Sequence, residues 1–275
     1  MATENTESAE STGFAAEWES WHATHEKGVG APFGPLSPVG MAWLDETPVR
    51  VNGAPGRWSW RDGRVVLELA VGENPVLDGR ELNPRGGDTT VSLPEVTAVG
   101  YLIGDGDHRI EVALRGSRPI VRPRHPRNPS VTGYRGTPAY PADPAWAVTA
   151  TYRPFDHPRP ITLGSVLDGL EHEQFRAAGT LVLELAGTNH ELTVLATGDP
   201  TTVQLLFTDA TSGATTWRDA RTLSVDVSGP VIVDFNRAVN LPCAYTDHAT
   251  CPLPPAGNHL DVEVTAGEII PNERK

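Results

Sequence analysis

A cluster of polar residues close to the C-terminal end of the sequence is the first candidate for chemistry. It follows the alternating apolar stretch 231–235, so an acid, amides and an arginine leave the end of one predicted strand together. The carboxylate of Asp234 can serve as a general base and the phenol of Tyr245 as a proton donor. Arg237 can bind an oxyanion, because a planar guanidinium matches carboxylate and phosphate groups. The amides that can orient a ligand beside them are Asn236, Asn240 and Asn258.

The same residues also fit a purely structural role. The loop that follows Arg237 is irregular and rich in proline, and amides together with an Asp–Arg pair can satisfy the backbone groups of such a loop. The sequence leaves both interpretations open.

Arginine is concentrated in the middle of the chain. Residues Val112 to Ala142 contain six arginines and no acidic residue, while the whole chain has a formal net charge of −13. We expect Arg118, Arg122 and Arg221 to join Arg237 in binding a small anionic molecule. The alternative is that these arginines pair with the surplus of acids around them. Nucleic acid is not expected as a partner, because the net charge is negative and no aromatic and basic RNA-binding motif occurs.

Two groups of residues could hold a metal, and neither has a standard spacing. The triplet His22, His25 and Glu26 has the order His-x-x-His-Glu rather than His-Glu-x-x-His, and a solvated helix face is the favoured interpretation. Seven residues separate Cys243 from Cys251, and we interpret both as small buried hydrophobic residues, with a reversible disulfide left open. We therefore expect no metal and no cofactor. Motifs of serine hydrolases, P-loop NTPases and dinucleotide-binding proteins do not occur.

The elements that must position these residues are mainly strands. The 27 glycines and 25 prolines exclude a helical bundle, and the one amphipathic helix is predicted at Phe14 to Lys27, with Trp18 and Trp21 packed on a sheet. Alternating segments then predict an all-β protein with two antiparallel sheet-rich halves, packed as a barrel or a sandwich. One predicted strand is Trp146 to Tyr152. A hairpin is predicted where the turn Gly187 to His190 follows the strand Thr180 to Ala186, whose Leu181, Leu183 and Leu185 share one face. In this division residues 1–28 form a disordered tail and the helix, 29–121 the first β-half, 122–145 a proline-rich crossover, and 146–275 the second β-half.

Composition also predicts location. No apolar run is long enough to span a bilayer, and Met1 to Thr12 is acidic and polar, unlike a secretory signal. Two cysteines are too few for a disulfide scaffold. We expect a soluble cytoplasmic protein with no membrane partner, and a homodimer is left open.

The motif from Asp234 to Pro255, together with Phe207 to Gly213, Arg221 and the closing Ala266-Gly267-Glu268, resembles the DUF1684 family of uncharacterised bacterial and archaeal proteins. The resemblance extends over nearly the whole chain and includes an arginine pattern at Arg115, Arg118 and Arg122. It implies that Asp234, Asn236, Arg237, Asn240, Cys243, Cys251 and Asn258 belong to the family motif. Two positions depart from the pattern: Leu241 stands where a proline is expected, and His125 stands where an Asp is expected, which would leave Arg122 or Arg124 unpaired.

These observations favour an enzyme that acts on a small anionic organic metabolite in a pocket at the mouth of a β-barrel. A non-catalytic binding module and a structural protein are the alternatives. An enzyme needs a titrating carboxylate or phenol beside the arginines, a binding module needs only the pocket, and a scaffold needs neither.

Overall fold

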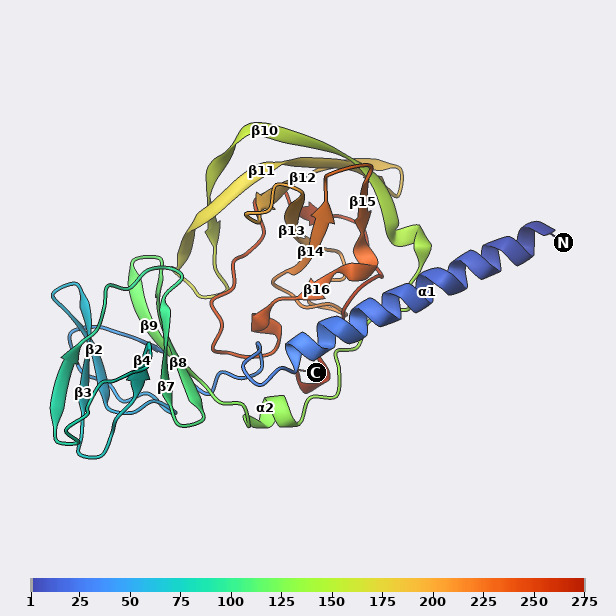
Figure 1. The fold of residues 1–275 in the computed structure, drawn as a ribbon. Helices are drawn as coiled ribbons and strands as arrows, with labels where there is room; N and C mark the ends of the chain where they lie inside the picture. The colour runs from blue at the N-terminus through green and yellow to red at the C-terminus, as the bar shows by residue number, and fades with distance from the viewer. Residues whose placement is uncertain (1, 275) are drawn as a thin grey trace. The chain divides into compact units, whose positions relative to one another are not determined.

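A computed structural model describes residues 2–274 and the side chains of residues 13–274. The chain forms two compact units: unit 1 contains Met1–Lys27, Gly136–Tyr245 and Cys251–Lys275, and unit 2 contains Gly28–Arg135 and Thr246–Thr250. Antiparallel sheets dominate both, with one long helix at the N-terminus (Figure 1). The predicted all-β class is confirmed. In the part of the chain that is described, the sheets are sandwich-like and none closes into a barrel.

Unit 2 is built from short strands in two antiparallel sheets. The first sheet has the order β1-β9-β8-β7-β4-β5 and the second the order β2-β3-β6. Trp58, Leu67, Ile103 and Ile110 fill its core and are completely buried. The elements are β1 (Ala42–Trp43), β2 (Arg57–Arg61), β3 (Arg64–Leu69), β4 (Val76–Leu77), β5 (Arg80–Glu81), β6 (Thr89–Ser92), β7 (Tyr101–Asp105), β8 (His108–Arg115), β9 (Arg118–Arg124) and the short helix α2 (Pro129–Thr132).

Unit 1 carries one large sheet of order β15-β10-β11-β12-β13-β14-β16, with β17 added in parallel to β13. In Figure 1 the long strands β10 and β11 arch over the shorter ones. The strands are β10 (Ala147–Gly164), β11 (Glu171–Leu185), β12 (Thr188–Ala196), β13 (Thr202–Asp209), β14 (Arg221–Asp226), β15 (Val231–Asp234), β16 (Val239–Asn240) and β17 (His259–Leu260). The helical elements are α1 (Ala2–Val29) and the 3-10 turns η1 (Pro144–Trp146), η2 (Phe235–Arg237), η3 (Pro242–Ala244) and η4 (Asn272–Arg274).

Strand β10 is much longer than the sequence pattern predicts. The predicted strand, 146–152, corresponds to the part with apolar alternation, whereas β10 continues to Gly164 through Pro154, Pro158 and Pro160. β15 pairs only with residues Ala147 to Ala150, so the rest of β10 has an open edge. Prolines are tolerated in such an edge strand, because no ladder bond is lost there.

The predicted hairpin between β11 and β12 is confirmed, with its turn at Ala186 and Gly187 rather than at Gly187 to His190. Leu181, Leu183 and Leu185 share one buried face, and Leu185 pairs with Thr188 across the turn. The two turn residues, Ala186 and Gly187, have φ of +51° and +76°, as the tight turn of a twisted hairpin requires.

Helix α1 begins at Ala2 rather than at Phe14, and its second half packs on the rest of unit 1. The indole N–H of Trp18 donates to the carbonyl of Asn236 at 2.6 Å, and the carboxylate of Glu26 accepts the backbone N–H of Thr137 at 2.8 Å. Gly136 has φ of +101°, and a Cβ there would lie 2.5 Å from Glu26 Oε1. A glycine at this position therefore lets the helix come close. Within residues 2–274, no helix combines the length and apolar character needed to cross a membrane.

We expect Leu181→Ala to lower the free energy of unfolding by about 2–5 kcal/mol, because it leaves a cavity at a completely buried position. Ile232→Ala is the matched control, since Ile232 lies in the same sheet with 45% of its surface exposed and should change stability by less than about 1 kcal/mol. Urea denaturation followed by circular dichroism measures both. Equal losses in the two variants would contradict this assignment of the core.

Candidate functional site

The candidate site is centred on Glu268, a carboxylate that is only 1% exposed. Its Oε2 atom accepts the backbone N–H of Asn240 at 2.7 Å and the hydroxyl of Tyr245 at 3.2 Å. The backbone N–H of Glu268 donates to Ala238 O at 2.8 Å. The preceding Gly267 has φ of +75°, and a Cβ there would lie 2.5 Å from the same carbonyl. Glycine at position 267 therefore permits the hydrogen bond from Glu268 N–H to Ala238 O, and this bond positions the carboxylate.

Two histidines of α1 face the other oxygen of this carboxylate. The Nε2 atoms of His22 and His25 lie 3.4 and 3.3 Å from Glu268 Oε1. Because the two histidines are three residues apart, both lie on one face of the helix. Their rings stack on Trp18 and Trp21, with interplanar angles of 10° in both pairs. Helix α1 and the C-terminal segment, which are far apart in the sequence, therefore meet at the buried carboxylate of Glu268.

The contacts of the two imidazoles with Glu268 are close approaches rather than well-aligned hydrogen bonds. Within the described residues, Nε2 of His22, Nε2 of His25 and Oε1 of Glu268 are buried and make no hydrogen bond of normal geometry. Burial alone would raise the pKa of Glu268, but the two imidazoles and the N–H of Asn240 outweigh burial and lower it. Glu268 is therefore ionised at neutral pH.

This arrangement has the parts of an acid–base site. A carboxylate that faces Nε2 favours a proton on that atom, which leaves Nδ1 of the same ring for a second partner. The side chain of His25 is 27% exposed, against 11% for His22. The hydroxyl of Tyr245 also bonds Thr137 Oγ1 at 2.9 Å. His25 is thus the more accessible of the two histidines.

The sequence pattern pointed to only part of this site. Tyr245 and Asn240 were predicted and do meet at Glu268, whereas Glu268 itself was not among the candidates. The prediction of a solvated helix face is wrong for His22, which is buried against Glu268. The order His-x-x-His-Glu and the closing Gly-Glu were the available signals, but nothing in the sequence showed that they meet.

The predicted base, Asp234, caps a 3-10 turn. Its carboxylate accepts the backbone N–H of Asn236 at 3.1 Å and the side-chain N–H of the same residue at 2.8 Å. Arg237 lies 3.3 Å from Asp234 and 2.7 Å from Glu17 of α1, with its guanidinium over the ring of Trp21. The contacts of Arg237 with Asp234, Glu17 and Trp21 therefore connect α1 to the end of β15.

The other predicted amides also hold structural elements together. Asn236 exchanges two hydrogen bonds of 2.9 Å with the backbone of Asp143. Asn258 accepts the N–H of Thr193 and donates to the carbonyls of Thr193 and Leu206, so it bridges β12 and β13.

Arg221 is buried with a partner of its own. Its side chain is 1% exposed, and Nη2 lies 2.6 Å from Asp209 Oδ2. It also donates to the backbone carbonyls of Val264, Ala266 and Glu268. Burial lowers its pKa, and the charge of Asp209 acts in the opposite direction. These bonds tie the segment that precedes Glu268 to β14.

Arg118 and Arg122 lie in unit 2. Arg118 sits over the ring of Trp43 and lines an open hollow of about 480 Å³ whose lining also includes Asp45, Glu46 and Asp62. Arg122 forms a two-point ion pair with Glu111. The four arginines predicted to bind one anion are therefore divided between the two units, and Arg122, Arg221 and Arg237 each pair with a carboxylate.

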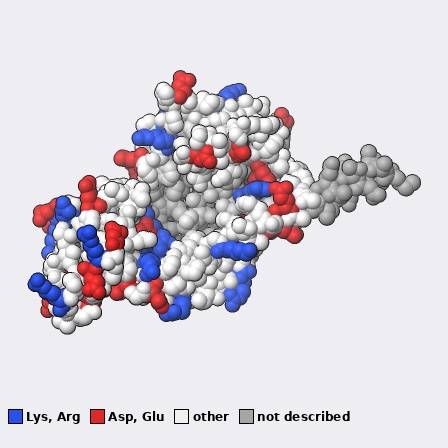
Figure 2. Space-filling model, viewed as in Figure 1, with Lys and Arg blue, Asp and Glu red and all other residues white. Residues whose placement is uncertain are grey.

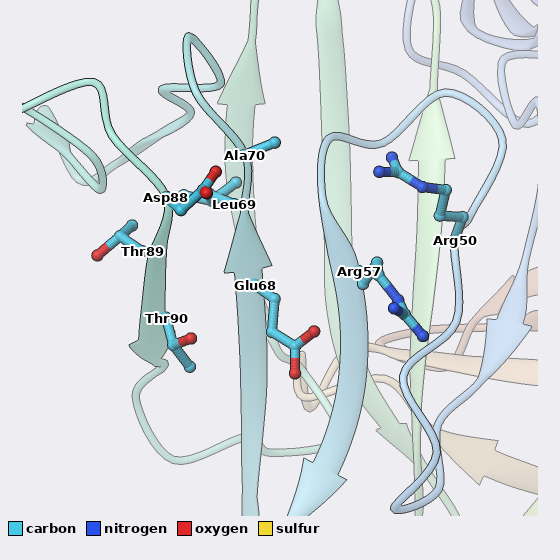
Figure 3. Close-up of a pocket in the computed structure, with 8 residues that line it drawn as sticks. All are labelled: Arg50, Arg57, Glu68, Leu69, Ala70, Asp88, Thr89 and Thr90. Atoms are coloured by element: carbon cyan, nitrogen blue, oxygen red, sulfur yellow. The ribbon is translucent and has the colours of Figure 1, made fainter.

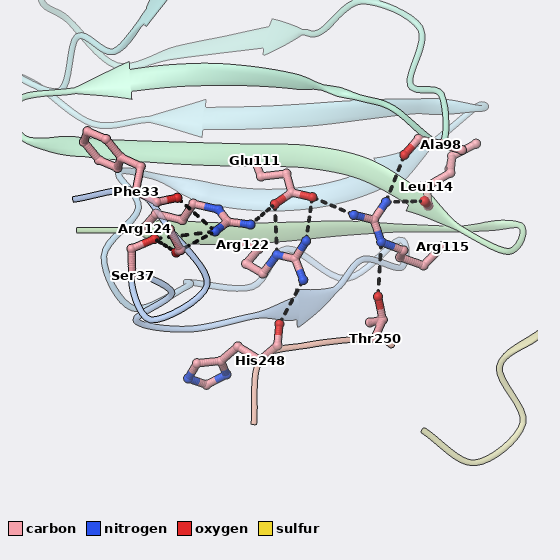
Figure 4. A network of polar contacts seen from close by, with 11 residues as sticks. Phe33, Ser37, Ala98, Glu111, Leu114, Arg115, Arg122, Arg124, His248 and Thr250 are labelled. Carbon is pink, nitrogen blue, oxygen red and sulfur yellow. Dashed lines mark hydrogen bonds and ion pairs between the residues drawn. The ribbon is translucent and has the colours of Figure 1, made fainter. Parts of the chain in front are cut away.

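Three arginines meet at Glu111 (Figure 4). Arg115, Arg122 and Arg124 approach its carboxylate at 2.6, 2.7 and 3.0 Å. The expectation that His125 leaves Arg122 or Arg124 unpaired is therefore wrong, and the ring of His125 lies beside that of His108. Burial would raise the pKa of Glu111, but Arg122 and Arg124 lower it to about 2.

Elsewhere the charges of unit 2 are balanced. A second hollow of about 510 Å³ is lined by Arg50 and Arg57 together with Glu68 and Asp88 (Figure 3). On the face shown in Figure 2, basic and acidic side chains are interspersed over the strands of this unit. Neither hollow has an excess of positive charge.

The two cysteines are free and buried, as predicted. The backbone N–H of Cys243 donates to the sulfur of Cys251 at 3.3 Å, so the loop between them doubles back. The hydrogen bond to Cys251 and burial both raise the pKa of the Cys243 thiol. The Cys243 thiol is therefore protonated at neutral pH.

Comparison with known proteins gives a family but no activity. The family described as "Protein of unknown function (DUF1684)" matches residues 132–269. A solution NMR structure of the uncharacterized protein from gene locus rrnAC0354 of Haloarcula marismortui is 28% identical, with 50% of this chain and 78% of that chain covered and a TM-score of 0.42. No curated protein matches the chain.

The family match is narrower than the sequence resemblance predicted. It begins at residue 132, so helix α1 and the arginine pattern at Arg115, Arg118 and Arg122 lie outside it. Glu268, Tyr245 and Asn240 lie inside it, whereas the two histidines that face Glu268 do not.

We expect Glu111 to stabilise the fold above about pH 4.5, its usual pKa, and this contribution to be lost as the pH falls toward about 2. A folded pKa below the unfolded one has this sign, and the difference corresponds to about 3 kcal/mol. Stability should therefore depend less on pH between 4.5 and 2 in Glu111→Gln than in the wild type, as measured by urea denaturation at each pH. The exposed Glu81 supplies the control Glu81→Gln. An unchanged acid profile in Glu111→Gln would rule out the stabilisation.

Proposed function

Because the chain belongs to the DUF1684 family, whose function is unknown, we propose its function from the group around Glu268. The protein is an enzyme that transfers protons on a small anionic organic molecule. The observation that carries this proposal is the convergence of a buried carboxylate, two imidazoles and a phenol at one place.

In this proposal each residue of the group has a distinct task. His25, the more exposed histidine, takes a proton from the substrate through Nδ1. Glu268 holds the ring of His25 and stabilises the positive charge that forms on it, as a carboxylate does beside a catalytic histidine. Tyr245 shares the other oxygen of Glu268 and is the proton donor of the group.

Arg237 supports the choice of an anionic substrate. Its guanidinium lies 5.4 Å from the ring of Trp21, which stacks in turn on His25. The side chain of Arg237 is 36% exposed, and its ion pair with Glu17 involves a carboxylate that is 73% exposed. An exposed pair of this kind is weak and can be replaced by the carboxylate of a substrate.

A binding module would also use Arg237, but it would not need a buried carboxylate between two imidazoles. Burying a charge is costly unless the charge is well paired. Here three buried polar atoms lack aligned hydrogen bonds, a cost that a module for binding alone has no need to bear. This imbalance favours an enzyme over a module that only binds.

The test is proton exchange at carbon. Wild-type protein is incubated in D2O with a panel of small keto, hydroxy and amino acids, and loss of the signal from the hydrogen next to the carboxylate or carbonyl is followed by proton NMR. We expect His25→Gln to lower the exchange rate on the active compound by about 10²- to 10⁴-fold, the usual contribution of a general base.

His157→Gln is the matched control, because His157 is an exposed histidine of β10 in the same unit. It should keep the wild-type rate. Binding of a panel compound without exchange would instead assign the protein to the non-catalytic binding class. Full activity in His25→Gln would exclude His25 as the base.

A further inference from the structure

Three arginines gather around the single carboxylate of Glu111. Arg115, Arg122 and Arg124 all lie within 3.0 Å of one carboxylate (Figure 4). Among residues 13–274, Glu111 is the only carboxylate in ion-pair contact with these three guanidinium groups. Three positive charges therefore share one directly paired carboxylate.

Neutral groups supply the remaining contacts. Arg122 donates to the carbonyl of His248 at 3.0 Å, and Arg115 donates to the hydroxyl of Thr250 at 3.2 Å. Backbone carbonyls and a serine hydroxyl surround Arg124 at 3.3–3.5 Å, which is long for hydrogen bonds. Dipoles of this kind orient the guanidinium groups but do not cancel their charge.

The surroundings make the close approach of these like charges costly. The side chains of Arg115, Arg122 and Arg124 are 15%, 10% and 20% exposed, so water screens them poorly. Burial and the charges of its two neighbours lower the pKa of Arg115, while Glu111 acts in the opposite direction. An anion that joined the cluster would remove this repulsion.

Donors remain for such an anion. A guanidinium has five N–H groups, and Arg122 uses one each from Nε, Nη1 and Nη2. Two of its N–H groups are left without an acceptor among the described residues, and the side chain still touches solvent. Two N–H groups from one guanidinium are the geometry that binds an oxyanion at two points.

From this geometry we propose that the Glu111 cluster of unit 2 is a binding site for a phosphorylated small molecule. A phosphate monoester carries a charge of about −1.5 to −2 at neutral pH and has three acceptor oxygens, so it matches both the charge and the spare donors. Residues Thr246–Thr250, which supply two contacts of the cluster, lie inside the family match, so the site includes a segment of the family motif. It shares no residue with the group around Glu268.

The experiment is calorimetric titration of the full chain with phenyl phosphate at low ionic strength, with acetate as a singly charged comparison. We expect phenyl phosphate to bind more tightly than acetate. Arg124→Gln should weaken phenyl phosphate binding about tenfold or more, because it removes one charge from the rim of the cluster. Arg127→Gln is the control, since Arg127 is 70% exposed and pairs with Asp107, and it should bind as the wild type does.

A second variant separates binding from structure. Glu111→Gln raises the net charge of the cluster, so it should strengthen phenyl phosphate binding about fivefold or more if the arginines are a binding site. If they only hold the fold together, Glu111→Gln loosens them and binding does not improve. Weaker binding in Glu111→Gln, no binding by the wild type, or an equal loss in Arg127→Gln and Arg124→Gln would overturn the proposal. Circular dichroism confirms that each variant is folded.

Discussion

The buried negative charge of Glu268 is the constraint on which the rest of unit 1 depends. A carboxylate with 1% exposure must be surrounded by donors or cations, and the chain supplies them from three separate stretches: α1, the η3 turn and the end of β16. The docking of α1 through Trp18 and Glu26 brings the two histidines to this carboxylate, and the glycine at 267 permits the backbone contact beside it.

Unit 2 differs from unit 1 because it has no net charge. Its arginines and acidic residues are equal in number, so the whole net charge of −13 lies on unit 1. Within this neutral unit, three arginines nevertheless gather on Glu111. Glu268 is a carboxylate placed among groups that can gain or lose protons, whereas Glu111 is one placed among groups that stay charged at any physiological pH. The first arrangement suits proton transfer and the second suits electrostatic binding.

The sequence predicted the features that depend on local pattern. Alternation identified the hairpin face of Leu181, Leu183 and Leu185, because a residue's side of a strand is fixed by its neighbours two positions away. It did not predict the continuation of β10 beyond residue 152, since prolines in an open edge strand leave no alternating signal. It also missed the pairing of His22 with Glu268. Their contact depends on how a helix docks on a sheet, and no local spacing encodes that.

Residue type alone did not distinguish residues that hold the fold together from residues that form a site. The number of their hydrogen-bonding atoms that already have a partner does distinguish them. Asn258 uses both N–H groups and its oxygen within the sheet, so nothing is left for a ligand. Asp234 is likewise occupied by the turn that it caps. Arg122 keeps two N–H groups, and the imidazole of His25 keeps the nitrogen that does not face Glu268. Because buried polar groups in folded proteins are nearly all satisfied, spare capacity in a partly exposed, charged cluster is the physical signal that distinguishes a site from a scaffold.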